Sequence, residues 1–400
     1  MKTKCIMILA LLALTSLCAC SEESASVNFD LGPSQEMIAK SLVSMGDTAR
    51  LERVMAKARR GEKIVVVTIG GSITQAAAAS APEKRWANLV AKWWIDKFPN
   101  TKVDFINAGI GATASDIGCH RVCDHVLKYK PDFVVTEYAV NDTGSDMAGE
   151  TMEGIVRQVL KQPNSPAMML LFTMHWDGQN AQAQHALVGK CYGLPMVSFR
   201  NAVWPEFQAG HIKWQDVMPD TIHPNDWGHR CLAAFVTSVL DKVYASLPDD
   251  KKLPRIKSLP KPLISDRFEW TSMLNASNTK PCVNNGWAVT DVNMFAQGWE
   301  TSVPRSTIEF DVEGNTISLM YYRADGDMGI AQAQVDDLPP VSIDASFPGG
   351  WGGYSAWKLI AQNLAPGMHK LRITVTPDKA PTSNGHKFQL QAVMVAGRQH

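Results

Sequence analysis

The feature that most constrains this chain is the alternation of short apolar runs with amphipathic stretches between residues 60 and 247. Runs such as Ile64–Ile69 and Phe133–Tyr138 are apolar along most of their length, so the strands they predict are buried on both faces. Stretches with apolar residues at helical spacing separate these runs, as at Glu83–Phe98 and Ser115–Leu127. Strands of this kind, alternating with helices, predict a parallel sheet between two helical layers.

The remaining elements follow the same two patterns. Three further strands are expected at Val103–Ile106, Met168–Thr173 and Pro195–Val197. Helices are expected at Glu150–Lys161 and at Asn225–Leu247, and helical spacing also runs from Glu36 to Arg60. We therefore assign residues 36–247 to one α/β domain.

The pattern changes near residue 248. Residues 248–262 are charged and rich in proline, as linkers are. Beyond them, in residues 263–400, the apolar periods are short and punctuated by Gly, Pro, Asn and Asp, which predicts an all-β, sandwich-like second domain. Two domains also suit a chain of 400 residues, since a single hydrophobic core seldom serves that length. The expected strands are Ser306–Val312, Thr316–Tyr322, Ile330–Val335, His369–Val375 and Lys387–Val395.

The first residues are a targeting segment. Two lysines precede the apolar run Ile6–Leu17, which is short for a membrane span. Leu17-Cys18-Ala19-Cys20 resembles a bacterial lipobox, and this resemblance implies that residues 1–19 are removed and that the thiol of Cys20 carries a lipid. A plain secretory peptide cut after Ala19 is the alternative.

The residues after Cys20 extend this expectation. Ser21-Glu22-Glu23 resembles the acidic signal that sends some Gram-negative lipoproteins to the cell surface, and residues 20–35 are polar, as a tether would be. We expect a secreted lipoprotein at the outer membrane, the cell surface or the periplasm of a Gram-negative bacterium. It would meet the membrane only through its N-terminal lipid.

Charge and cysteine content exclude several kinds of partner. Lys plus Arg and Asp plus Glu both number 39, so nothing suggests nucleic acid or another polyanion as partner. Cys119 and Cys123 lie four residues apart in an expected helix, which is poor geometry for a disulfide. Although His120 and His125 are close, no second ligand pair follows at zinc-type spacing. We expect buried free thiols, no metal and no cofactor.

A serine follows the first strand of the α/β domain directly, in Ile69-Gly70-Gly71-Ser72. A strand that runs into a Gly-Gly turn places the serine hydroxyl on an exposed corner, where it can meet a carbonyl carbon. Gly-Gly-Ser is also common in ordinary turns, so the motif alone does not predict a nucleophile.

Asp220-Thr221-Ile222-His223 supplies what such a serine needs. A serine hydroxyl is a poor nucleophile until a base removes its proton, and a histidine suits that role. Asp220, three residues before His223, can accept a hydrogen bond from the other ring nitrogen. In isolation, His223 would be read as a structural residue of a turn.

Two more segments at strand ends offer hydrogen-bond donors. Asn141, after the third strand, has a side-chain amide that can stabilise the oxyanion of a tetrahedral intermediate. The glycine-rich Asn107–Thr113, after the second strand, can present a backbone N–H there. Each of these two segments also fits an ordinary turn. In parallel sheets, however, ligands bind beyond the carboxyl ends of the strands, and the candidate residues on the first three strands fall at such ends.

Together, the four segments resemble the sequence blocks of the SGNH/GDSL hydrolase superfamily, over residues 60 to 246. The resemblance implies a flavodoxin-like three-layer α/β/α domain with Ser72 as nucleophile, His223 as base and Asp220 orienting it. It also implies an oxyanion hole formed by the Ser72 N–H, the Asn141 side chain and a backbone N–H of the second block.

The chain departs from the superfamily pattern at two positions. Gly71 stands where an aspartate usually precedes the serine; that aspartate is not catalytic, so activity is still expected. The glycine of the second block, counted from Asn107, falls on Ala112 rather than Gly111. Both remain candidates for the backbone donor.

The resemblance implies a serine esterase more firmly than it implies a substrate, because SGNH enzymes cleave sugar acetates, lipid esters, thioesters and aryl esters. The secretory leader, the absence of a long apolar lid and a second domain like those that accompany carbohydrate esterases favour O-acetyl groups on carbohydrates. A lipase, acylhydrolase or thioesterase of the same superfamily is one alternative. A non-catalytic carbohydrate-binding lipoprotein is the other.

Aromatic residues mark the expected substrate contacts. His175 and Trp176, after the fourth strand, are expected to line the pocket, with Trp204 and Trp214 as weaker candidates. Most aromatics of the β domain are expected in its core. Trp351 and Tyr354 are the best exceptions, because the glycines around them predict an exposed loop. The others considered are Trp287, Trp299 and Trp357.

Overall fold

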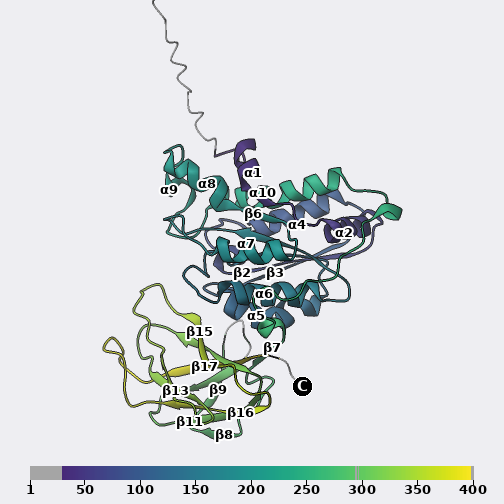
Figure 1. The fold of residues 1–400 in the computed structure, drawn as a ribbon. Coiled ribbons are helices and arrows are strands. Elements are labelled where there is room, and N and C mark those ends of the chain that lie inside the picture. The colour runs from purple at the N-terminus through teal and green to yellow at the C-terminus, as the bar shows by residue number, and fades with distance from the viewer. Residues whose placement is uncertain (1–28, 293–294, 296, 398–400) are drawn as a thin grey trace, which may run out of the picture.

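The computed structural model describes residues 29–292, 295 and 297–397. They form an α/β domain and, below it in Figure 1, a domain of β-sheets. The predicted signal peptide and the predicted lipid attachment at Cys20 lie outside the described residues. Within these ranges, no helix is both long and apolar enough to cross a bilayer.

A six-stranded sheet forms the centre of the first domain, in the order β1-β6-β5-β4-β2-β3. The five strands β2 to β6 are parallel, and β1 pairs antiparallel with β6 at the edge. The order of the parallel strands is flavodoxin-like, which confirms the predicted fold. The strands are β1 (Leu42–Ser44), β2 (Ile64–Gly70), β3 (Val103–Gly109), β4 (Phe133–Glu137), β5 (Ala167–Phe172) and β6 (Met196–Ser198).

Helices cover both faces of this sheet (Figure 1). One apolar cluster packs α2 (Ala49–Arg59), α4 (Trp86–Lys97) and α10 (Asp226–Ala245) on one face. A second packs α5 (Ser115–His125), α6 (Ala148–Leu160) and α7 (Gln182–Cys191) on the other. The shorter helices are α1 (Gln35–Ser41), α3 (Ser72–Gln75), α8 (Phe199–Gln208) and α9 (Trp214–Val217), with 3₁₀ turns at Pro82–Lys84, Leu127–Tyr129, Asp250–Lys252 and Arg267–Glu269.

The helical spacing over Glu36–Arg60 does not form one helix, contrary to the simplest expectation. The first helix ends at Ser41 and is followed by β1, whose Leu42 pairs with Val197 of β6. Gly46 then takes a left-handed conformation, with a φ of 57°, against the backbone of Leu194. Pairing with the sheet edge and this close turn prevent continuation of the helix.

The second domain is a sandwich of two antiparallel sheets, as predicted. One sheet has the order β15-β12-β17-β10-β9, with β7 also paired to β17, and the other has the order β14-β13-β16-β11-β8. The strands are β7 (Thr271–Leu274), β8 (Val283–Asn285), β9 (Ala288–Asp291), β10 (Gln297–Thr301), β11 (Thr307–Glu313), β12 (Thr316–Arg323), β13 (Ile330–Val335), β14 (Val341–Asp344), β15 (Tyr354–Gln362), β16 (Met368–Val375) and β17 (Phe388–Ala396).

The two domains are packed together rather than loosely tethered. An apolar cluster joins Ile110 and Ile117 of the first domain to residues such as Met320 of the second. Beside it, Arg157 of α6 pairs with the buried Glu269 at 2.7 Å. The segment between the domains is itself held, since the Arg53 guanidinium donates to the Pro254 carbonyl.

The cysteines of α5 differ in exposure. Cys119 is buried as expected, whereas Cys123 is exposed, so that part of the expectation is wrong. Cys123 lies one turn further along, where it lines a cavity at the edge of the domain interface. Among the described residues, no group of three or more His, Cys, Asp or Glu side chains is placed to hold a metal ion.

Candidate active site

Ser72 occupies the sharp turn between β2 and α3. Gly71 precedes it, and a Cβ at that position would collide with the side-chain oxygen of Asn141. An aspartate at this position, as is usual in SGNH enzymes, would therefore require the Asn141 amide to shift. A glycine at 71 lets the Asn141 amide lie directly beside the turn that carries Ser72.

A linked serine, histidine and aspartate lie at this edge of the sheet. The distance between Ser72 Oγ and His223 Nε2 is 2.8 Å, and that between His223 Nδ1 and Asp220 Oδ2 is 2.7 Å. The Nδ1–H donates to the carboxylate, which leaves Nε2 free to accept the Ser72 proton. This geometry supports general-base activation of the serine.

The Asp220 carboxylate is held ionised by its hydrogen bonds. Burial alone would raise its pKa, but hydrogen bonds from the His223 ring and from the N–H groups of His223 and Ile222 lower the pKa of Asp220 overall. Both N–H donors reach Oδ1 at 2.7 Å, so Oδ2 remains available to the ring. The carboxylate thus accepts the hydrogen bond that orients the imidazole.

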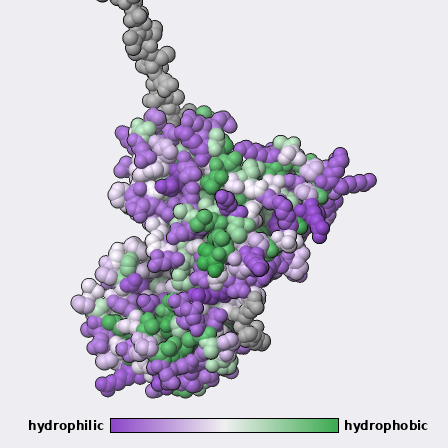
Figure 2. Space-filling view, viewed as in Figure 1, coloured by the Kyte–Doolittle hydropathy of each residue, from purple (hydrophilic) through white to green (hydrophobic). Residues whose placement is uncertain are grey.

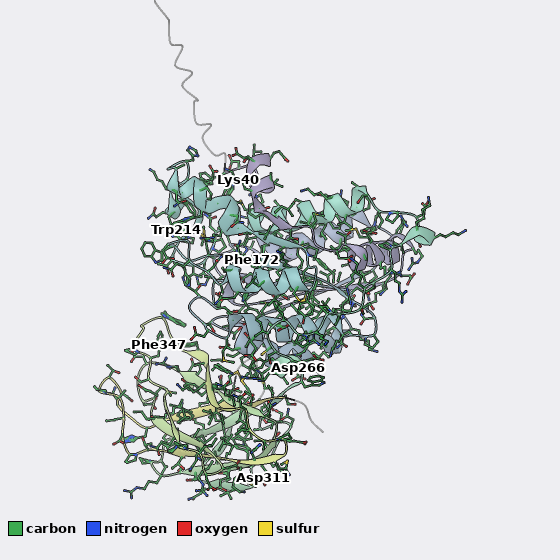
Figure 3. The ribbon with its side chains drawn as sticks, viewed as in Figure 1. Lys40, Phe172, Trp214, Asp266, Asp311 and Phe347 are labelled. Carbon is green, nitrogen blue, oxygen red and sulfur yellow. The ribbon has the colours of Figure 1, made fainter. Side chains whose placement is uncertain are left out.

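Two tryptophans support the loop that carries Asp220 and His223. The Trp214 indole N–H donates to the Asp220 carbonyl at 2.7 Å, and the Trp176 backbone N–H donates to the Thr221 carbonyl at 2.9 Å. Trp214 is labelled in Figure 3, at the edge of the upper domain. The structure gives Trp214 a supporting role instead of the weakly expected pocket-lining one.

The structure separates the two candidate backbone donors. The Gly111 N–H already donates to the side-chain oxygen of Gln75 at 2.8 Å. The Ala112 N–H has no hydrogen-bond partner among the residues described, and Ala112 has a left-handed φ of 53°. A backbone of that kind normally belongs to glycine, which fits the alignment of Ala112 with the glycine of the second block. The geometry favours Ala112 as the donor.

The site opens into a cleft of about 760 Å³ that both domains line. The first domain contributes Ser72, His223, Asn141 and His175, among other residues. From the second domain come Phe295, Tyr322, Trp351, Gly353, Tyr354 and Ser355. In Figure 2, the two domains form separate lobes with an indentation between them, and their surface is mostly hydrophilic with local apolar areas.

Trp351 and Tyr354 form an aromatic rim on the β-domain side of this cleft, and Phe347 packs against both rings without lining the cleft itself. Trp351 stacks on Tyr354 with ring centroids 5.3 Å apart, and Phe347 contacts both rings edge-on at 5.0 Å. Trp351 is 60% exposed despite these contacts. Phe347 lies on the same side of the molecule as Trp214, as Figure 3 shows.

The other aromatic candidates differ in whether they line the cleft. His175 lines the cleft, and its Nε2–H donates to the Val140 carbonyl at 3.1 Å. Trp176 is 59% exposed but is not among the residues that line the cleft. Trp204 packs against Gly178. Trp287 and Trp299 are buried in the β-domain core and Trp357 is partly buried, as expected for most of these rings.

Sequence reasoning missed Gln75, Phe295 and Tyr322. Gln75 is three residues after Ser72, on the same short helix, which was a usable signal. Phe295 and Tyr322 reach the cleft only because the second domain docks onto the first, and no local pattern indicates that placement.

A buried glutamate lies directly behind the turn that carries Ser72. Glu137 accepts hydrogen bonds from the hydroxyls of Thr173, at 2.5 Å, and Thr74, at 3.2 Å. Burial raises its pKa from the ordinary 4.5 to about 7, although these hydrogen bonds oppose the shift. As pH rises from 4.5 to 7, the unfolded chain loses this proton before the folded protein does. The free energy of unfolding therefore falls across that window.

Glu137→Gln should remove this pH-dependent cost. We expect the variant to gain stability over the wild type at pH 8 relative to pH 5, by at most about 3 kcal/mol. Urea unfolding at both pH values measures the difference, with the exposed Glu83→Gln as control. An equal stability change at both pH values would refute the argument.

Residues 68–231 match the model of the GDSL-like Lipase/Acylhydrolase family. The structure is similar to that of a two-domain esterase (CEX) active on acetylated mannans, with 31% sequence identity and a TM-score of 0.83, over 90% of this chain and 99% of that one. A structure of a two-domain esterase described in the same words, co-crystallised with mannopentaose, gives 31% identity and a TM-score of 0.82, over 91% of this chain and 98% of that one. A search among curated proteins found no match.

Proposed function

We propose that this chain, which belongs to the GDSL-like lipase/acylhydrolase (SGNH) family of esterases, removes O-acetyl groups from carbohydrates. Acetylated mannans are the proposed substrate class. The observation that carries this proposal is the cleft shared by the two domains, with Ser72 and His223 at the sheet edge and the aromatic rim opposite. An apolar face beside polar groups suits a sugar ring. The similar two-domain esterase active on acetylated mannans adds support.

In the proposed reaction, Ser72 Oγ attacks the acetyl carbonyl while His223 Nε2 takes its proton. The negative charge of the tetrahedral intermediate develops on the carbonyl oxygen, where the N–H groups of Ser72 and Ala112 and the Asn141 amide stabilise it. As the bond between the carbonyl carbon and the sugar oxygen breaks, the imidazolium protonates that oxygen, so that the sugar leaves with a free hydroxyl and acetyl-Ser72 remains. Water activated by the same imidazole releases acetate and restores the serine.

Acetate release from natural polymers tests the substrate class. We expect the protein to release acetate from acetylated mannan faster than from acetylated xylan, and to hydrolyse p-nitrophenyl acetate faster than the octanoate. Hydrolysis of octanoate without acetate release from any acetylated carbohydrate would instead support a lipase. Binding to mannan without hydrolysis of any ester would support a non-catalytic carbohydrate-binding protein.

The aromatic rim should matter only for large substrates. Trp351→Ala removes an exposed ring and should raise KM for acetylated mannan about tenfold, which corresponds to ~1.4 kcal/mol. Its kcat/KM for p-nitrophenyl acetate should stay unchanged, because that ester does not reach across the cleft. Tyr129→Ala removes an exposed ring from the 3₁₀ turn that precedes β4, and is the control. An unchanged KM for mannan in Trp351→Ala would exclude the rim from substrate binding.

We also propose attachment of the protein to the outer membrane through a lipid on Cys20. The apolar run Ile6–Leu17 and the lipobox-like residues before Cys20 support this localisation. Cys20→Ser should move the protein from the membrane fraction to the soluble fraction, as immunoblotting of the fractions can measure.

A further inference from the structure

A buried arginine lies beneath the proposed oxyanion hole. Arg121 of α5 has no exposed surface, and in the described part of the chain no carboxylate forms an ion pair with it. Arginine stays charged in proteins, and a buried charge without a counter-ion is costly. Stability alone therefore gives no reason for a guanidinium at this position.

The guanidinium instead contacts three successive strand ends. One terminal nitrogen donates to the Ala108 carbonyl at 2.6 Å. The other donates to the Gly70 carbonyl at 3.0 Å and to the Tyr138 hydroxyl at 2.7 Å. Gly70 ends β2, Ala108 is the penultimate residue of β3, and Tyr138 follows β4. One planar group thus links three neighbouring strands of the sheet at their carboxyl ends.

Each of these strand ends carries one proposed oxyanion donor. Gly70 is two residues before Ser72, and Ala108 is four residues before Ala112. Tyr138 is three residues before Asn141. The donors come from three separate segments, so their spacing depends on how these segments are held together. Oxyanion stabilisation requires donors that are already in place when charge develops.

We propose that Arg121 is a positioning residue for the oxyanion hole, holding the ends of β2, β3 and β4 at the spacing at which three donors meet one oxygen. This inference rests on the proposed esterase function. It also accounts for the chemistry of the contacts, because a guanidinium can donate several hydrogen bonds in a fixed plane, whereas the point charge of a lysine cannot.

Three variants test the proposal with p-nitrophenyl acetate. Arg121→Met should lower kcat about 10- to 100-fold, because small displacements of reacting groups are costly, while KM changes little. Tyr138→Phe removes one of the three strand-end contacts and should lower kcat several-fold with little change in Tm. Arg157→Met is the matched control: it removes another buried arginine, on α6, and should lower Tm without lowering kcat.

Binding of a boronic acid separates positioning from general damage, because its tetrahedral serine adduct places an oxygen in the oxyanion hole. Its inhibition constant should rise in Arg121→Met and Tyr138→Phe by the same factor as kcat/KM falls, with an unchanged pH profile. Wild-type kcat in a folded Arg121→Met, or an equal kcat loss in Arg157→Met, would overturn the proposal. If Arg121→Met does not fold, the Tyr138→Phe variant is the test. A Tyr138→Phe variant with the wild-type kcat and the wild-type inhibition constant would overturn the proposal. An inactive wild type would refute the esterase function instead.

Discussion

Ser72→Ala should abolish ester hydrolysis, lowering kcat for p-nitrophenyl acetate by about 10⁴- to 10⁶-fold. The Ser72 Oγ is the atom that lies 2.8 Å from His223 Nε2, and alanine offers no nucleophile in its place. Within the described part of the chain, His223 is the one hydrogen-bond partner of this hydroxyl, so Tm should change little. Purified protein, assayed by p-nitrophenol release and by free acetate, gives the comparison.

Ser246→Ala is the matched control, since Ser246 is an exposed serine at the C-terminal end of α10 and does not line the cleft. It should keep the wild-type kcat. A Ser72→Ala variant that retains the wild-type rate would exclude Ser72 as nucleophile, and with it the proposed acyl-enzyme route.

Asn141→Ala should lower kcat by about 100- to 1,000-fold with a nearly unchanged KM. The side-chain amide is proposed to donate to the oxyanion, which exists only in the tetrahedral state. Its buried Oδ1 atom has no hydrogen-bond partner among the described residues, so truncation breaks no internal bond of that atom. We therefore expect a large loss of rate and a small change in Tm.

Steady-state kinetics and thermal melting of Asn141→Ala, beside the exposed Asn100→Ala as control, measure both effects. A KM increase that accounts for the whole loss of kcat/KM would indicate that Asn141 binds the ground state. A large fall in Tm would indicate a structural role.

Most of the α/β domain was predictable because its strands have a strong local signal. Apolar runs such as Ile64–Ile69 can only be buried on both faces, and the helices between them fix a parallel arrangement. The edge strand β1 was not predictable in this way. Leu42–Ser44 is short, and its conformation depends on pairing with β6, which lies more than 150 residues later.

The candidate site was also predictable only in part. Ser72, Asn141 and His223 were identifiable because each sits at the end of an element whose position follows from the chain pattern. The choice between Gly111 and Ala112 was not, since it depends on where the Gln75 side chain points. The roles of Phe295 and Tyr322 depend on the docking of two domains, which is decided by surface complementarity rather than by local sequence.

The segment between the two domains is fixed to the first domain. Arg53 binds the Pro254 carbonyl, and Lys257 pairs with Asp47 at 2.9 Å, so the segment runs along the first domain instead of swinging free. A chain cut after residue 247 would lose Glu269, the ion-pair partner of Arg157. It would also expose the apolar surface around Ile117 to solvent. The two domains should therefore tumble in solution as a single particle, and the first domain alone should be less stable than the whole protein.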